Sequence, residues 1–160
     1  MAELRIALLA VTLAVACDPA AAQAPVASGI TAPAGWQSLP ELAAAVTAAA
    51  TGPGASVLGS EAWGETSRGC YAVWFAIVGG PTTADQIIAG LAGATIESRD
   101  VVKPTTPDGP VTAMFARGEY RGRLRARIAG DRVTALACFA NQREPAICDR
   151  ACEPVLGALK

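Results

Sequence analysis

The sequence predicts an α+β fold: an antiparallel, meander-rich sheet of five or six strands with two capped helices and a C-terminal helix packed on it. Three observations lead to this prediction. Residues 69–80 form an apolar run closed by glycines, which is typical of a strand buried on both faces. Tight-turn signals at 118–119 and 130–131 separate alternating segments, and helix-type apolar spacing occurs near both ends of the domain.

The N-terminal residues predict export. Residues 6–16 carry no charge and are too few to span a bilayer, so residues 1–16 are expected to be a signal peptide. Residues 13–17, Leu-Ala-Val-Ala-Cys, resemble the lipobox of bacterial lipoproteins, although the leucine stands one position early. The resemblance implies that Cys17 is lipidated and anchors the protein to a membrane, in the periplasm or at the cell surface.

A second route of processing stays open, because residues 14–16 and 20–22 both offer small-residue sites for ordinary signal peptidase. That route would give a freely secreted protein. In either case residues 17–35, rich in alanine and proline and almost without charge, predict an extended tether. The remaining residues, 36–160, are expected to form one disulfide-containing globular domain.

The first half of the domain predicts a helix, a hairpin and a second helix. Ser38 and Glu41 form a capping box with proline in the first turn, so a helix is expected over 39–51, before Gly52 and Pro53. Strands are predicted over 57–65 and along the central apolar run, with a turn at 66–69. Thr83 caps the predicted second helix, which ends at Gly93. A further strand is expected over 95–102 and a proline-rich loop over 103–110.

The second half predicts a meander with a defined register. Pairing outward from the turn at 130–131 sets Ile128 opposite Val133 and Leu124 opposite Ala137, which gathers the apolar residues of both strands on one face. The turn at 118–119 adds the strand that begins at Val111 to the same face. The opposite face then carries an arginine row, defined as Arg121, Arg123, Arg125 and Arg127, because side chains two apart in a strand point the same way.

The arginine row is the candidate binding site that the sequence suggests. Guanidinium groups bind phosphates, sulfates or carboxylates through two hydrogen bonds each, so the row suits lipid head groups, phosphorylated glycans or extracellular DNA. The alternative is a solvated strand face that discourages edge pairing and meets Glu97 or Asp100 of a neighbouring strand.

Four cysteines beyond Cys17 predict two disulfides in an exported domain. We expect Cys70 to pair with Cys138, since both lie on strands that can be neighbours. Cys148 would then pair with Cys152, in a C-terminal helix over 144–160 that Pro154 kinks or restarts. The alternative pairing joins both C-terminal cysteines to the sheet through the two strand cysteines.

The order of these elements resembles that of small single-domain folds of the PsbP/Mog1 type, a resemblance that carries no functional implication. Histidine is absent, which excludes Ser-His-Asp and Cys-His catalysis and histidine-based zinc sites. A net charge of −1 argues against a dedicated nucleic-acid binder. No metal or cofactor is expected.

Two classes of function remain. The first is a non-enzymatic cell-envelope protein that binds or supports a partner, with the arginine row as one possible surface. The second is a carboxylate-dependent hydrolase, for which the acids on predicted strands are Glu61, Glu65, Glu97 and Asp100.

Overall fold

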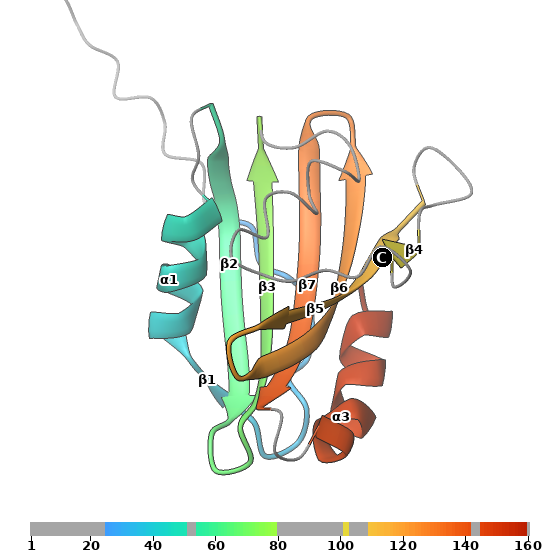
Figure 1. The fold of residues 1–160 in the computed structure, drawn as a ribbon. Coiled ribbons are helices and arrows are strands. Elements are labelled where there is room, and N and C mark those ends of the chain that lie inside the picture. The colour runs from blue at the N-terminus through green and yellow to red at the C-terminus, as the bar shows by residue number, and fades with distance from the viewer. Residues whose placement is uncertain (1–24, 51–53, 80–100, 103–108, 142–144, 160) are drawn as a thin grey trace, which may run out of the picture.

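The computed structural model describes residues 25–50, 54–79, 101–102, 109–141 and 145–159. In this part of the chain, seven strands form one sheet in the spatial order β1-β2-β3-β7-β6-β5-β4, and every neighbouring pair is antiparallel (Figure 1). The strands are β1 (Gln37–Ser38), β2 (Ser56–Glu65), β3 (Cys70–Val78), β4 (Val101–Val102), β5 (Val111–Arg117), β6 (Tyr120–Ala129) and β7 (Arg132–Asn141). The predicted α+β class is therefore confirmed, with the two-residue β1 as the strand that the sequence did not predict.

The predicted meander of β5, β6 and β7 is confirmed residue by residue. Ile128 lies opposite Val133, and Leu124 lies opposite both Ala113 and Ala137. Gly118 and Gly130 have positive φ angles of 58° and 62°, a conformation that favours glycine in tight hairpin turns. The turns therefore fix the register, and the register fixes which side chains share a face.

The central strand β3 lies between β2 and β7 and is buried on both faces, as the apolar run predicts. The two faces of the sheet carry different helices, α1 (Pro40–Ala50) and α3 (Pro145–Gly157). We call them the α1 face and the α3 face. The predicted helix over 83–93 lies outside the described residues.

Helix α1 covers the β2–β3 side of the α1 face. Ala43 packs with Ala62 and Val73 in a buried cluster, to which Leu39, Leu42, Val46 and Phe139 add partly buried side chains. The Leu39 amide donates to the Ala62 carbonyl at 2.8 Å, and the hydroxyl oxygens of Thr47 and Ser60 are 2.6 Å apart. The helix predicted over 39–51, with its stripe of Leu39, Leu42 and Val46, is thus confirmed.

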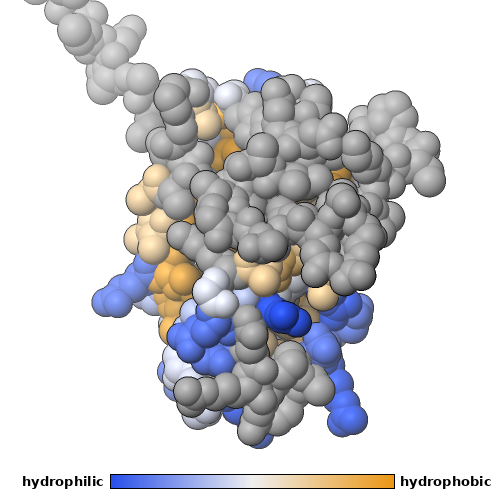
Figure 2. Space-filling view, viewed as in Figure 1, coloured by the Kyte–Doolittle hydropathy of each residue, from blue (hydrophilic) through white to orange (hydrophobic). Residues whose placement is uncertain are grey.

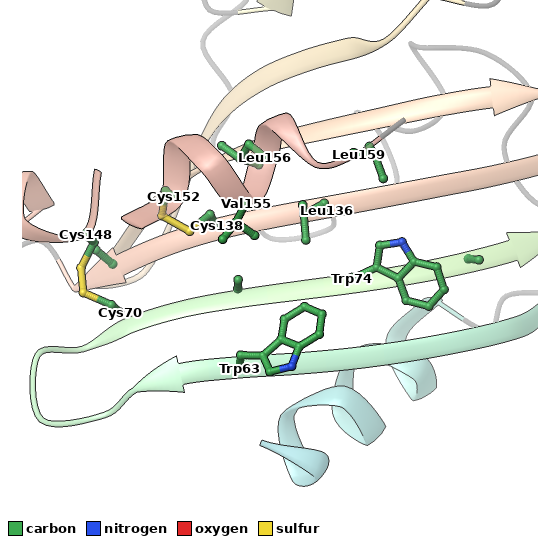
Figure 3. Close-up of a cluster of buried hydrophobic side chains, with 13 residues drawn as sticks. Trp63, Cys70, Trp74, Leu136, Cys138, Cys148, Cys152, Val155, Leu156 and Leu159 are labelled. Carbon is green, nitrogen blue, oxygen red and sulfur yellow. A yellow bond between two sulfur atoms is a disulfide. The ribbon is translucent and has the colours of Figure 1, made fainter. Parts of the chain in front are cut away.

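Helix α3 covers the α3 face and closes the largest buried cluster among the described residues (Figure 3). Trp63, Trp74 and Leu136 of the sheet meet Val155, Leu156 and Leu159 at the end of the chain. Pro154 lies inside α3, and the helix continues through it. The helix therefore does not restart at this proline.

The disulfide pairing predicted from the sequence is also wrong. Cys70 is bonded to Cys148, and Cys138 is bonded to Cys152, with Cα–Cα distances of 5.5 and 5.7 Å (Figure 3). Cys70 lies opposite Ala140, so Cys138 is its diagonal neighbour, and diagonal side chains are roughly 7–8 Å apart. A disulfide needs about 3.8 Å between β-carbons, whereas residues four apart in a helix have theirs about 5–6 Å apart. The alternative pairing is the one that occurs.

The N-terminal boundary of the folded domain also differs from the prediction. Residues 25–35 belong to it, because Val26, Ile30 and Ala32 pack against the cluster beneath α3. The Val26 amide donates to the Leu58 carbonyl at 2.8 Å. A β-carbon on Gly59 would collide with the Val26 carbonyl, so a glycine in β2 makes this close approach possible. The part of the predicted tether before Pro25, and Cys17 with it, lies outside the described residues.

Candidate functional site

The arginine row lies on the α3 face, side by side as the register predicts. Its members Arg121, Arg123, Arg125 and Arg127 face Ala140, Cys138, Leu136 and Thr134 of β7. The face itself is not open, because both disulfides hold α3 over its neighbouring positions. The prediction that the whole row faces solvent is therefore wrong for its central members.

Arg123 binds the acids of α3. Its Nη1 donates to Glu153 Oε1, and its Nη2 lies 3.8 Å from Asp149 Oδ1. Asp149 and Glu153 are four residues apart in the helix and so lie on one side of it, toward β6. The Arg123 side chain is 25% exposed while both carboxylates are 66% exposed, which leaves little of this guanidinium for another ligand.

Arg125 binds the end of α3. Its Nη1 donates to the Leu156 carbonyl at 3.3 Å, next to the last residue of the helix. A cation at this position also opposes the negative end of the helix dipole. Its Nε is buried without a hydrogen-bond partner among the described residues. Arg127 is partly buried, so Arg121 is the exposed member of the row.

The candidate catalytic acids do not form a pair. Glu61 accepts hydrogen bonds from the Ser28 amide at 2.7 Å and from the Ser28 hydroxyl at 2.6 Å, which fixes the N-terminal segment. Glu65 lies 3.2 Å from the Nε of Arg68 in the following turn. Each acid thus has a partner of its own, Ser28 for Glu61 and Arg68 for Glu65, and no hydrogen bond among the described residues joins the two carboxylates. Glu97 and Asp100 lie outside the described residues.

The α1 face carries a cluster of aromatic side chains that the sequence analysis missed. The rings of Tyr71 and Phe139 stack at 5.4 Å, and Tyr120 meets both edge to face, at 6.0 and 5.9 Å. Phe115 extends the cluster at 6.3 Å from Phe139. Tyr71 lies opposite Phe139, Tyr120 is the first residue of β6 and Phe115 belongs to β5, so four strands bring these rings together.

These rings form one wall of a groove against the start of α1. The groove has a volume of about 500 Å³ and is lined by Leu39, Pro40, Glu41, Leu42, Thr66, Tyr71, Tyr120 and Phe139. We call it the aromatic groove. Most of its lining is apolar, and on the viewed surface apolar residues gather beside α1 above a hydrophilic region (Figure 2). The groove can therefore bury apolar groups of a ligand while hydroxyl groups fix their orientation.

The electrostatics of the groove keep Tyr71 neutral. Desolvation raises the pKa of Tyr71 above its ordinary value of 10.0, and interactions with Tyr120 and Glu119 add to the increase. The Tyr71 hydroxyl therefore stays protonated at neutral pH and is available as a donor. The sequence held one signal of this site, because Tyr71 alternates with the buried Cys70 and Ala72 and so points to the opposite face.

Among the described residues, no group of three or more histidine, cysteine, aspartate or glutamate side chains is placed to hold a metal ion. The described helices lack the length and apolar character that crossing a membrane requires. No protein-family model, curated protein or solved structure matches this chain.

Proposed function

We propose that this protein is an exported domain of the bacterial cell envelope that binds a partner protein through the aromatic groove and catalyses no reaction of its own. Export is supported by the signal-type leader and by two disulfides in the folded domain. Disulfides persist in the periplasm and outside the cell, whereas cytosolic thiols stay reduced. Lipidation at Cys17 would anchor the domain to a membrane, and cleavage without lipidation would release it.

The observation that carries the proposal is the aromatic groove itself. Tyr71, Tyr120 and Phe139 are only partly buried, although each contributes a large ring to a shared wall. Aromatic side chains with few rotatable bonds lose little entropy when a partner covers them, which is why tyrosine is common at binding surfaces. A volume of about 500 Å³ holds two or three side chains of a partner, in the range of ordinary ligand sites.

The other two candidate functions have less support. Arg123 and Arg125 bind α3, so an anionic ligand on the arginine row would have to displace intramolecular contacts. Hydrolysis needs two converging carboxylates, whereas Glu61 and Glu65 bind Ser28 and Arg68.

Binding through the groove is tested with two adjacent residues of β6. Tyr120 lines the groove, while Arg121 is exposed on the opposite face. The mature domain is immobilised and incubated with detergent-solubilised envelope proteins. We expect Tyr120→Ser to lose the proteins that the wild-type domain retains and Arg121→Ser to keep them. Equal retention by both variants, or a loss confined to Arg121→Ser, would refute the groove as the binding surface.

Export and anchoring are tested by fractionating cells that express the full chain. We expect the wild type in the membrane fraction and Cys17→Ser in the soluble extracytoplasmic fraction, since the variant cannot be acylated. If the two chains distribute identically outside the cytoplasm, ordinary cleavage replaces lipidation. Recovery of the wild type in the cytoplasm would contradict export itself.

A further inference from the structure

Two arginines from distant parts of the chain lie at one hollow beside the Cys70–Cys148 disulfide. Arg68 belongs to the turn between β2 and β3, and Arg150 belongs to α3. Arg68 precedes Cys70 by two residues, and Arg150 follows Cys148 by two. Because the disulfide holds the Cα atoms of Cys70 and Cys148 5.5 Å apart, it also brings Arg68 and Arg150 into the lining of the same hollow.

The hollow has a volume of about 570 Å³, and its walls combine positive charge with apolar surface. Trp36 and Pro33 form part of the apolar wall, and Glu65 is the acid that lines it. Glu65 Oε1 lies 3.2 Å from Arg68 Nε and so occupies one edge of that guanidinium. Arg150 is exposed and pairs with no acid among the described residues. With two arginines and one glutamate, the lining has a net charge of +1.

We propose that this hollow binds a phosphate monoester. A guanidinium group binds a phosphate through two parallel hydrogen bonds, and a second arginine from another element adds a further pair to the same tetrahedral group. The indole of Trp36 and the ring of Pro33 would pack against the carrier of the phosphate, because sugars and short aliphatic groups bury area on such surfaces. The carrier is either a soluble ester or a lipid head group.

This site is independent of the aromatic groove. It lies on the α3 face, where Glu65 and Cys70 are paired on neighbouring strands, whereas Tyr71 points to the other face. It also differs from the arginine row, because Arg123 and Arg125 have partners in α3 while Arg150 has none among the described residues. The two binding proposals therefore stand or fall separately.

The test is a titration of the isotope-labelled, disulfide-bonded domain with inorganic phosphate and with glucose 1-phosphate. Binding is followed by NMR through the indole N–H of Trp36 and the Nε–H signals of the arginines. We expect saturable shifts of the Trp36 and Arg150 signals. Arg150→Gln should raise the apparent Kd about tenfold, since one charge-assisted bidentate contact is lost. Arg132→Gln removes another exposed arginine, at the start of β7 and at the end of the sheet away from Cys70, and should leave the Kd unchanged.

Glu65→Gln gives a test of opposite sign. Loss of this carboxylate frees Arg68 and removes a negative charge that repels the phosphate. We therefore expect binding about two- to fivefold tighter, which is the factor that the energy of a surface ion pair corresponds to. The amide spectrum of each variant shows that the domain is folded. A Kd that responds equally to Arg150→Gln and Arg132→Gln, or weaker binding by Glu65→Gln, would overturn the proposal.

A parallel arm identifies the carrier. Vesicles of phosphatidylcholine with and without phosphatidic acid, whose head group is a phosphate monoester, are sedimented with the same variants. Binding to phosphatidic acid that Arg150→Gln abolishes supports a lipid head group, and shifts with glucose 1-phosphate support a soluble ester. If the soluble phosphates leave the Trp36 and Arg150 signals unshifted and the vesicles do not sediment the domain, the hollow is not a phosphate site.

Discussion

The two faces of the sheet are closed by different means. On the α3 face, a helix is joined to β3 and β7 by two disulfides, and the arginines beneath it bind its acids and its last turn. On the α1 face, α1 is held through Leu39, Ala43 and Thr47 without a covalent bond. An aromatic groove remains beside the start of α1.

This difference separates residues that stabilise the protein from residues that are available for binding. Strand β6 carries four arginines on the α3 face, where Arg123 and Arg125 contact α3. Its first residue, Tyr120, lines the aromatic groove on the α1 face. A row of like charges is therefore weak evidence for a ligand site when opposite charges elsewhere in the chain can cover it.

The largest expected effect comes from breaking the covalent closure. The Cys70–Cys148 bond spans 78 residues and the Cys138–Cys152 bond spans 14. Loop entropy predicts that they stabilise the fold by roughly 4.5 and 3 kcal/mol, respectively. Urea unfolding of the two paired Cys→Ala variants should show the larger loss for Cys70→Ala/Cys148→Ala. Equal losses, or the reverse order, would show that loop length does not govern the closure of this face.

The next largest effects are the losses in the free energy of unfolding when an aromatic side chain is removed from each face. Trp74 is 3% exposed beneath α3, so Trp74→Ala should lower the free energy of unfolding by about 3–5 kcal/mol. Phe139 is partly buried in the groove wall, and Phe139→Ala should cost roughly half as much. Both values come from chemical denaturation. A larger loss for Phe139→Ala would mean that the aromatic cluster belongs to the core and is not a binding surface.

A smaller effect is expected for the ion pairs of Arg123. Both partner carboxylates are largely exposed, so Arg123→Gln should change the free energy of unfolding by less than about 1 kcal/mol. The difference from the wild type should shrink further in high salt. A loss above about 2 kcal/mol would indicate that α3 excludes water from this pair far more completely than its exposure suggests.

The smallest effect concerns pH. The pKa of Tyr71 is raised in the folded protein, so the folded state holds this proton more tightly than the unfolded state. The resulting stability is fully present below about pH 10 and is lost as the pH rises through the folded pKa. Chemical denaturation at pH 9 and pH 11 should show that the free energy of unfolding decreases less between these two pH values for Tyr71→Phe than for the wild type. An identical decrease would place the proton release elsewhere.

The strand register could be predicted because it depends on local chemistry. Glycines at 118 and 130 adopt the turn conformations that set β5, β6 and β7 opposite one another, and alternation then assigns each side chain to a face. The disulfide pairing could not be obtained in this way. It depends on a diagonal offset between β3 and β7 and on where α3 lies, and both are long-range properties.

The sequence contained a sign that α3 covers the arginine row, but it can be interpreted only once the fold is known. Asp149 and Glu153 are spaced to share one side of a helix, and their carboxylates match the positive strand across which α3 lies. The packing of the N-terminal segment also had a sign in the sequence. Residues 26, 28, 30 and 32 alternate inward like a strand, although their composition is typical of a tether.

The most direct test of the account uses a photo-crosslinking phenylalanine derivative at Tyr120 and, in a second chain, at Arg121. These two residues are neighbours in β6 with side chains on opposite faces, so the two chains differ in the face of the sheet that carries the crosslinker. Irradiation of intact cells should give crosslinked adducts to an envelope protein from position 120 and none from position 121. Adducts from position 121 alone would place the binding surface on the α3 face and contradict the account.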